Sequence, residues 1–430
     1  MNSAEHRDRT AGNPSAGDRA LDFLGLKRNV SLLLVMLVLV GLGEKLFQRF
    51  LPRYLAALGA GPLVIGLYGF LDTALGALYA LPGGRLTDRL GHRRSLLLFA
   101  SLNLVGYVLL AVPAWPVVLV GVLLCTAWSQ LSLPATFSLV AQQLPREKRV
   151  MGLAVQGIVR RVPMAVGPLV GGAVFTAFGI LTGMRWVLLA AAALTLLALA
   201  LHWRLAGPDP GPPADDRLTS LDVWRGFRPE LRRLLVSDIL IRFCEQIPNA
   251  FVILWVVERL GRSDAEFGVL SAVEMATAAV LYIPVAWWVD GRVARARRSR
   301  GGDDGTLPTT ERGPFIIATF VMFTAFPLML LFSAGWAGLL AAFVVRGLKE
   351  FGEPARKATI VDLAADGVKA RTVGVYYFVR DSTVAFAALL GGLLWRVNPE
   401  LTLWTAFGFG VAGTLVFALG SRRAANRSAA

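Results

Sequence analysis

The sequence predicts an all-α integral membrane protein in which about twelve transmembrane helices form two pseudo-symmetric six-helix bundles. Three observations support this fold class. Of the 430 residues, 55% are hydrophobic and the mean hydropathy is +0.58, which is too apolar for a soluble chain of this length. Apolar runs of the ~20 residues needed to cross a bilayer recur along the chain. The two halves of the sequence also carry charged residues at matching spacings.

The apolar runs follow a polar segment, residues 1–28. It contains no short apolar core with a small-residue cleavage site, so we interpret it as a cytoplasmic tail and not as a signal peptide. The runs begin near Asn29, Pro62, Ser95, Pro116, Val150, Gly183, Leu234, Phe267, Pro314, Trp336, Thr372 and Leu401. We therefore predict a first bundle over residues 29–205, a linker rich in Pro, Gly and Asp over 206–230, a second bundle over 231–420 and a C-terminal tail over 421–430.

The net charge of +15 is concentrated in alternate connections between the runs. This distribution follows the positive-inside rule and predicts a multi-pass protein of the cytoplasmic (inner) membrane with both termini in the cytoplasm. The exceptions on the opposite side are Arg49, Arg53, Arg259, Arg262 and Arg396. Arginines spread over separate loops do not form a continuous binding face, so the basic excess does not indicate nucleic-acid binding.

The two halves resemble each other in their charged residues. The matched pairs, with one gap in the alignment, are Glu44 with Glu245, Asp72 with Glu274, Asp88 with Asp290, and Arg160 with Arg380. Each arginine of the last pair precedes a Gly-Gly pair by 11 residues. A parallel repeat of two helix bundles predicts a transporter whose substrate site lies at their interface near the bilayer midplane.

A short charged motif lies between the second and third runs, where glycines bracket an acid and several arginines. Its fixed positions are Gly84, Asp88, Arg89, Gly91, Arg93 and Arg94. The spacing resembles the Gly-x-x-x-Asp-Arg-x-Gly-x-Arg-Arg motif of the major facilitator superfamily. The resemblance implies a tight cytoplasmic turn that acts, together with Asp290 in the second half, as a gate.

A second motif lies in the fifth run. Gly167, Pro168, Gly171 and Gly172 resemble the Gly-Pro-x-x-Gly-Gly motif of the proton-coupled drug and metabolite exporters of this superfamily, with Pro163 in place of an upstream glycine. We expect these residues, with Gly391 and Gly392 in the second half, to pack helices closely. An ordinary packing face of small residues is an equal alternative. The fourth run lacks the arginine that such exporters carry.

Charged residues inside spanning runs are costly, and they persist where they face a wet cavity or a partner. The candidates for proton coupling or the substrate cavity are Glu44, Asp72, Arg160, Glu245, Glu274, Arg346, Glu350, Arg380 and Asp381. A carboxyl group in a cavity of low dielectric gains a proton more readily, whereas a neighbouring arginine favours its ionised form. Glu245 is the first candidate for the proton carrier, with Asp72 or Glu274 next. The alternative is that these residues only hold the halves together.

The tenth run carries several charges at helical spacing. We predict the i,i+4 pairs Arg346–Glu350, Lys349–Glu353 and Glu353–Lys357. The deeper residues of this run are expected to reach the cavity. Those nearest the cytoplasm are expected to form a gate or a helix-end network.

The resemblance implies a secondary transporter that works by alternating access, and not an enzyme. We expect proton-coupled export of small amphipathic organic compounds, with proton-coupled uptake of a charged metabolite as the alternative. A membrane enzyme is disfavoured because no nucleophile, metal or phosphate motif stands out in the sequence. A non-transporting membrane receptor is disfavoured because it would not need acids near the middle of the membrane in both halves. The expected partners are the lipid bilayer, a small-molecule substrate and protons, with no nucleic acid, cofactor or metal. We expect a monomer.

Overall fold

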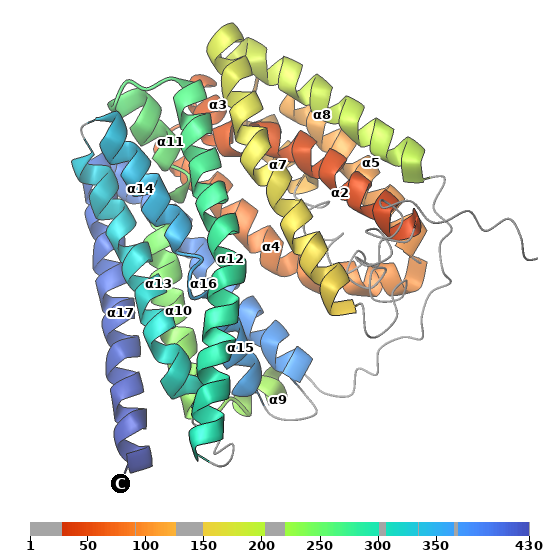
Figure 1. Ribbon diagram of the computed structural model, residues 1–430. Coiled ribbons are helices and arrows are strands. Elements are labelled where there is room, and N and C mark those ends of the chain that lie inside the picture. Colours follow the sequence, from red (N-terminus) through yellow and green to blue (C-terminus); the bar gives the residue numbers. More distant parts are fainter. Residues whose placement is uncertain are drawn as a thin grey trace, which may run out of the picture.

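The computed structural model describes residues 28–90, 92–125, 149–202, 220–300, 307–333, 335–364 and 369–429. Within these ranges the regular secondary structure is helical throughout (Figure 1). Each predicted apolar run lies in a helix that begins within seven residues of the predicted start, although the fourth run is described only to residue 125. The all-α membrane fold predicted from the sequence is confirmed.

The first half contains α2 (Arg28–Phe47), η1 (Gln48–Phe50), α3 (Leu51–Ala57), α4 (Pro62–Leu90), α5 (His92–Leu110), α7 (Arg149–Phe178) and α8 (Ile180–His202). The second half contains α9 (Ser220–Arg225), α10 (Pro229–Asn249), α11 (Val252–Leu254), η3 (Trp255–Arg259), α12 (Asp264–Arg300), α13 (Leu307–Phe332), α14 (Trp336–Leu348), α15 (Glu353–Asp362), α16 (Lys369–Val397) and α17 (Pro399–Ala429). By length and composition, five described helices are suited to crossing a membrane, and the bent pair formed by α10 with the helix after it makes a sixth.

The first and seventh helices are interrupted at corresponding depths. The first changes to a tighter turn at Gln48–Phe50 and resumes with Pro52 in the first turn of α3. The seventh contains Pro248 near the end of α10 and bends by 45° before Val252. Proline removes a backbone donor and cannot continue a regular helix, which accounts for both breaks. The interruptions place polar side chains beside the space between the bundles.

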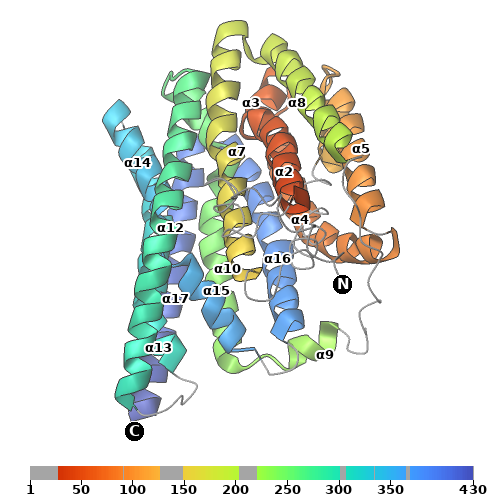
Figure 2. The ribbon, with the colours of Figure 1, turned by 45° about the vertical axis from the view of Figure 1, so that its right-hand side comes forward.

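The two bundles contact each other through two crossing helix pairs, α4 with α16 and α7 with α12. Glycines make the closest crossings: a Cβ atom at Gly66 would lie 2.8 Å from the backbone oxygen of Ala388, and one at Gly172 would lie 2.5 Å from that of Asp264. These crossings lie near the starts of α4 and α12. Toward Arg149 and Arg300, α7 and α12 diverge, at the end where α17 finishes (Figures 1 and 2).

The end of the molecule at which these glycines cross, called the closed end below, also contains the main hydrophobic core. Tyr54, Phe175, Trp255 and Phe267 belong to one buried cluster that draws residues from both halves. Under the predicted orientation this end faces away from the cytoplasm. A second cluster fills the second bundle and includes Val223, from within the segment predicted as a linker.

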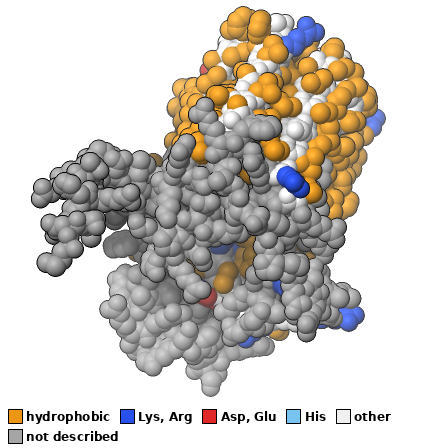
Figure 3. All heavy atoms as spheres, turned by 90° about the vertical axis from the view of Figure 1, so that its right-hand side faces the viewer, with side chains coloured by type: hydrophobic (Ala, Val, Ile, Leu, Met, Phe, Trp, Pro, Cys, Tyr) orange, Lys and Arg blue, Asp and Glu red, His pale blue; other side chains and the backbone are white. Residues whose placement is uncertain are grey.

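The outer surface of the first bundle is apolar where its atoms are described (Figure 3). On α8, Trp186, Leu189 and Leu196 are each more than half exposed, and Val108 on α5 is 68% exposed. Large apolar side chains that point outward in this number indicate contact with lipid and not with water.

One local expectation is wrong. The stretch from Gly84 to Leu90 was expected to be part of a short turn, but its backbone continues α4, and the next helix begins at His92. Only Gly91 lies between the two helices, and it falls outside the described residues. The helix continues through this stretch because arginine and leucine favour helical backbone.

Candidate functional site

A polar cavity of about 200 Å³ lies between the two bundles, beside the two helix interruptions. From the first half it is lined by Gln48, Arg49, Pro52, Tyr68, Gly69 and Asp72, and from the second by Gln246, Asn249, Ala250, Val252, Ile253, Phe267 and Arg346. A hydrogen bond of 2.7 Å from the Gln246 amide to the Thr73 hydroxyl joins the bundles nearby. The cavity is therefore placed where a parallel repeat puts a substrate site.

Glu274 of α12 lies beside this cavity and forms ion pairs with three cations. Its Oε2 atom is 2.6 Å from Nη1 of Arg49, and its Oε1 atom is 3.3 Å from Nε of Arg346 and 3.4 Å from Nζ of Lys349. The carboxylate is only 1% exposed. Because Arg49 belongs to the first half and the other two cations to the second, this cluster connects the bundles electrostatically.

Lys349 extends the cluster along the second bundle. Its Nζ atom is 2.6 Å from Oε1 of Glu245, whose Oε2 atom accepts from Nη1 of Arg242 at 2.7 Å. Arg242 lies 3.6 Å from Glu353 and 4.0 Å from Asp238. A continuous chain of alternating charges thus runs from the cavity toward the end where the bundles diverge.

The chain ends in a buried group around Asp238. Arg356 pairs with this carboxylate and, at 2.6 Å, with Glu353. Arg380 lies 3.4 Å from Asp238, and the Tyr376 hydroxyl donates to it at 3.1 Å. Because each buried charge has partners of opposite sign, the group can remain ionised within the helix bundle.

Asp72 has different surroundings. It lines the cavity from α4 together with the neutral side chain of Gln48, and Lys45 acts on it electrostatically from beyond ion-pair distance. Gln48 in turn accepts from Lys45, and Lys45 forms an ion pair of 3.1 Å with Glu44. Among the acids of the cavity and its charge chain, Asp72 alone has no arginine or lysine nitrogen within 4 Å in the described part of the molecule.

The structure places most of the predicted site residues in connected groups. Glu245, Glu274, Arg346, Arg380 and Asp381 belong to the chain of charges, with Asp381 held by Arg380 at 2.7 Å. Asp72 and Glu44 form the smaller group of the first half. Arg160 interacts electrostatically with Glu44 from α7. Glu350 lies apart from the chain, 3.5 Å from Arg161 of the opposite bundle.

Two of the three ion pairs predicted within the tenth run do not form. Only Glu353 and Lys357 pair, at 3.5 Å. The predicted partners separate because the helix is interrupted: α14 ends at Leu348, and Pro354 lies in the first turn of α15. Arg346 and Lys349 therefore turn toward Glu274, on another helix.

The side chains of the predicted gate are mostly outside the described residues. This applies to Asp88, Arg89, Arg93 and Asp290, although their backbones are helical. The backbone of Gly84 is part of α4, and Arg94 is exposed in the first turn of α5. The proposed role of these residues as a gate is not tested by their positions.

The glycine motifs lie at helix crossings related by the repeat. A side chain at Gly171 would meet the backbone oxygen of Leu46, and one at Gly391 would meet that of Ile247, two residues after the matched acids Glu44 and Glu245. Gly172 and Gly392 face the opposite bundle, near Asp264 and Gly66 respectively. Gly167 lies against Lys45, and Pro168 against Gly268.

Several site residues were missed by the sequence reasoning. Arg49 was counted only as an exception to the loop charges, yet it pairs with Glu274. Asp238 was not named, although Asp238, Arg242 and Glu245 follow an i, i+4, i+7 spacing that puts them on one helical face. That spacing is the signal that identifies the buried chain. The neutral residues Gln48 and Asn249 carry no comparable signal.

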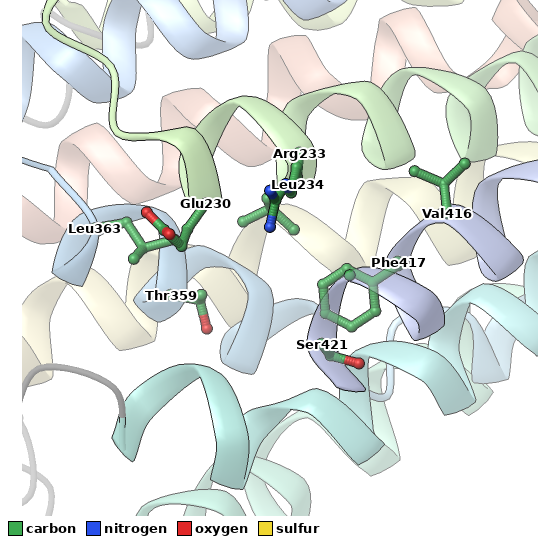
Figure 4. Close-up of a pocket in the computed structure, with 9 residues that line it drawn as sticks. Glu230, Arg233, Leu234, Thr359, Leu363, Val416, Phe417 and Ser421 are labelled. Carbon is green, nitrogen blue, oxygen red and sulfur yellow. The ribbon is translucent and has the colours of Figure 1, made fainter. Parts of the chain in front are cut away.

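A second, smaller pocket of about 30 Å³ lies at the far end of the second bundle, between α10, α15 and α17 (Figure 4). Leu234, Leu363, Val416 and Phe417 give it a mainly apolar lining, with Glu230 and Arg233 at its edge. It lies within one bundle, so it does not have the position of an alternating-access site.

The fold is shared with solved transporter structures. A nucleoside transporter NupG mutant superposes with a TM-score of 0.75, 14% sequence identity and coverage of 91% of this chain and 100% of that chain. A POT family transporter in complex with 5-aminolevulinic acid superposes with a TM-score of 0.71 and 13% sequence identity, over 92% of this chain and 96% of that chain. A bacterial homologue of the human lysosomal transporter Spinster, in an inward-facing and occupied conformation, has a TM-score of 0.70 and 13% sequence identity, over 91% of this chain and 96% of that chain.

No curated protein sequence matches the chain. The profile of the Major Facilitator Superfamily, by contrast, matches residues 33–298, which is more than half of the sequence. This match agrees with the two bundles and with the cavity between them. The chain is therefore a multi-pass membrane transporter and belongs to the Major Facilitator Superfamily.

Proposed function

We propose that the protein is a proton-coupled secondary transporter in which Asp72 carries the proton. The observation that supports this most directly is that Asp72 lines the cavity between the bundles without a direct ion pair: in the described part of the chain no cation lies within 4 Å of it, and Lys45 acts on it only at longer range. A carboxylate in such a place can be neutralised by a proton and ionised again when the cavity changes face.

The charge pairs make Glu245 and Glu274 less suitable carriers. Lys349 and Arg242 lie within 2.7 Å of Glu245, and Glu274 contacts three cations. Protonation of either acid would leave buried cations without their counter-charge, which is costly. We therefore place Asp72 before Glu245, the first candidate from the sequence, and assign the paired acids to holding the site together.

The contacts at the closed end suggest how access alternates. Arg53 pairs with Asp264 across the bundles, and Arg49 pairs with Glu274 nearer the cavity. The glycine crossings of Gly66 and Gly172 lie at the same end. Opening this end requires all of these contacts to separate while the diverging ends of α7 and α12 approach, which is a rocking motion around the cavity.

Two observations bear on the substrate and its direction. The Gly-Pro-x-x-Gly-Gly resemblance in α7 supports export. The cavity has a polar, charged lining and is smaller than the ~300–1,000 Å³ typical of pockets for drug-sized ligands. These properties favour a small polar compound over a large amphipathic one. We thus propose proton-coupled export of small polar compounds, with uptake of a charged metabolite as the second candidate because of the same charged lining.

The test uses the purified protein in liposomes and in inverted vesicles, with a panel of radiolabelled metabolites and an imposed pH gradient. The expected result is accumulation that requires the gradient in the parent and is absent in Asp72→Asn, which still catalyses downhill exchange of the substrate. Glu258→Gln, at an exposed acid near the closed end, is the matched control and should behave like the parent. Uphill transport by Asp72→Asn at the parent's rate would contradict the proposal.

A further inference from the structure

We infer that the cavity contains an anion-binding subsite, formed by the guanidinium groups of Arg49 and Arg346, that holds the carboxylate or phosphate of an organic substrate. The inference rests on the proposed transport function and narrows its substrate class. The two arginines come from opposite bundles and both line the cavity. A ligand bound to both would therefore connect the halves at the point where they rock.

Arg346 is fixed in position from several sides. Its Nη2 atom donates to Oδ1 of Asn249 at 2.8 Å, and its Nε atom lies 3.3 Å from Glu274. The guanidinium group also stacks on Phe326, 4.8 Å from the ring centroid. The side chain is only 8% exposed. Its remaining nitrogen, Nη1, has no hydrogen-bond partner in the described part of the chain and is not sealed from solvent.

Arg49 presents a similar free edge. Its Nη1 atom serves both Glu274, at 2.6 Å, and the Ser271 hydroxyl, at 3.4 Å. Its Nε and Nη2 atoms have no partner within the described residues, and the side chain is 26% exposed toward the cavity that it lines. A guanidinium group has five donors in a planar fork that matches the oxygens of carboxylate and phosphate. Both arginines therefore retain donors suited to an external anion.

Glu274 makes the subsite adjustable. It is the internal anion that now neutralises one side of both arginines, and it has Lys349 as a third partner. Lys349 keeps Glu274 paired if either arginine turns toward a ligand, so binding an anion leaves no buried carboxylate without a cation. Arg49, Arg346 and Asp72 are the charged residues that line the cavity, so its lining carries one positive charge in excess, which favours a negatively charged group on the substrate.

The other side of the cavity sets the size and polarity of the ligand. At ~30 Å³ per molecule, its volume corresponds to roughly six or seven waters. Gln48, Gln246 and Asn249 offer amides around the lining. The subsite thus suits a compact organic anion with hydrogen-bonding groups, and not an extended apolar compound or a simple organic cation.

Ligand binding is measured by thermal shift and by intrinsic tryptophan fluorescence on the purified full-length protein. The probes are small monocarboxylates, dicarboxylates and phosphate monoesters, each beside its neutral amide or alcohol analogue, with matched amines and free inorganic phosphate. We expect at least one organic anion to stabilise the protein while its neutral analogue and the amine do not. Loss of one charge-assisted contact in Arg346→Gln should weaken that binding by roughly ten- to a hundredfold.

The variant Glu274→Gln gives the sharpest result, because it removes the internal competitor of the ligand. Anion affinity should rise in this variant, with each shift measured against the variant's own unliganded protein. Arg346→Lys keeps the charge without the fork and should weaken binding less than Arg346→Gln. Arg371→Gln, at a half-buried arginine near the start of α16 and away from the cavity, is the control and should bind the anion like the parent.

Three outcomes would overturn the inference: no anion exceeding its neutral analogue in the parent, weaker anion binding in Glu274→Gln, or binding by the amine instead. These outcomes are separable from the failure of proton coupling. Anion binding with transport that ignores the pH gradient would reject only the role of Asp72. Gradient-driven transport of a cation or a neutral compound would reject only the subsite.

Discussion

The buried end of the charge chain allows a prediction with a matched control in the adjacent residue. Arg356 and Lys357 both pair with Glu353, but the side chain of Arg356 is 2% exposed and that of Lys357 is 51% exposed. Replacing Arg356 by methionine leaves Asp238 and Glu353 with one buried cation fewer, which costs about 3–5 kcal/mol in known buried pairs. Replacing Lys357 by methionine should lower the free energy of unfolding by less than about 1 kcal/mol, because water screens that ion pair.

The assay is thermal unfolding of both variants in detergent, followed by fluorescence-detected size exclusion. A third variant separates charge from packing: adding Asp238→Asn to Arg356→Met removes one of the stranded acids and should recover part of the lost stability. Arg380 and Tyr376 remain to bond the new amide or each other. Equal losses in Arg356→Met and Lys357→Met, or a further loss in the double variant, would refute the argument from burial.

Three further predictions concern the site and its closure. Glu245→Gln should lower thermal stability as well as transport, because Lys349 and Arg242 lose a shared partner; a stable variant with only its coupling lost would contradict this. Gly172→Ala should oppose closure, because the new methyl group meets the backbone of Asp264. A reporter cysteine in the cavity, Ala250→Cys, should then be labelled more readily from outside the cell. Gly374→Ala is the control and should not change the labelling, because the space around Gly374 is open. A cysteine placed in residues 206–219 should resist impermeant thiol reagents in intact cells, and labelling there would reverse the predicted orientation.

The helices and the repeat could be predicted because apolar length and charge spacing are local properties of the sequence. The starts of α4 and α14 were predicted at the residue where each begins. The ion pairs of the tenth run were not predictable in the same way, since an i,i+4 pattern assumes an unbroken helix. Arg49 was hidden for a related reason. Only the interruption at Gln48–Phe50 and the packing of α12 against the first bundle bring it to Glu274.

The matched acids Asp72 and Glu274 show how a symmetric scaffold can give two different sites. Their positions correspond in the repeat, yet Glu274 is surrounded by three cations and Asp72 by an amide. Burial of a charge is costly in both places, but only Glu274 has ion pairs that offset the cost. Lys45 acts on Asp72 only from beyond ion-pair distance, so in the proposed mechanism a proton neutralises this acid. Under the proposed mechanism the cavity has one acid that exchanges a proton and one that orients arginines, so that substrate and proton act on opposite sides of the same space.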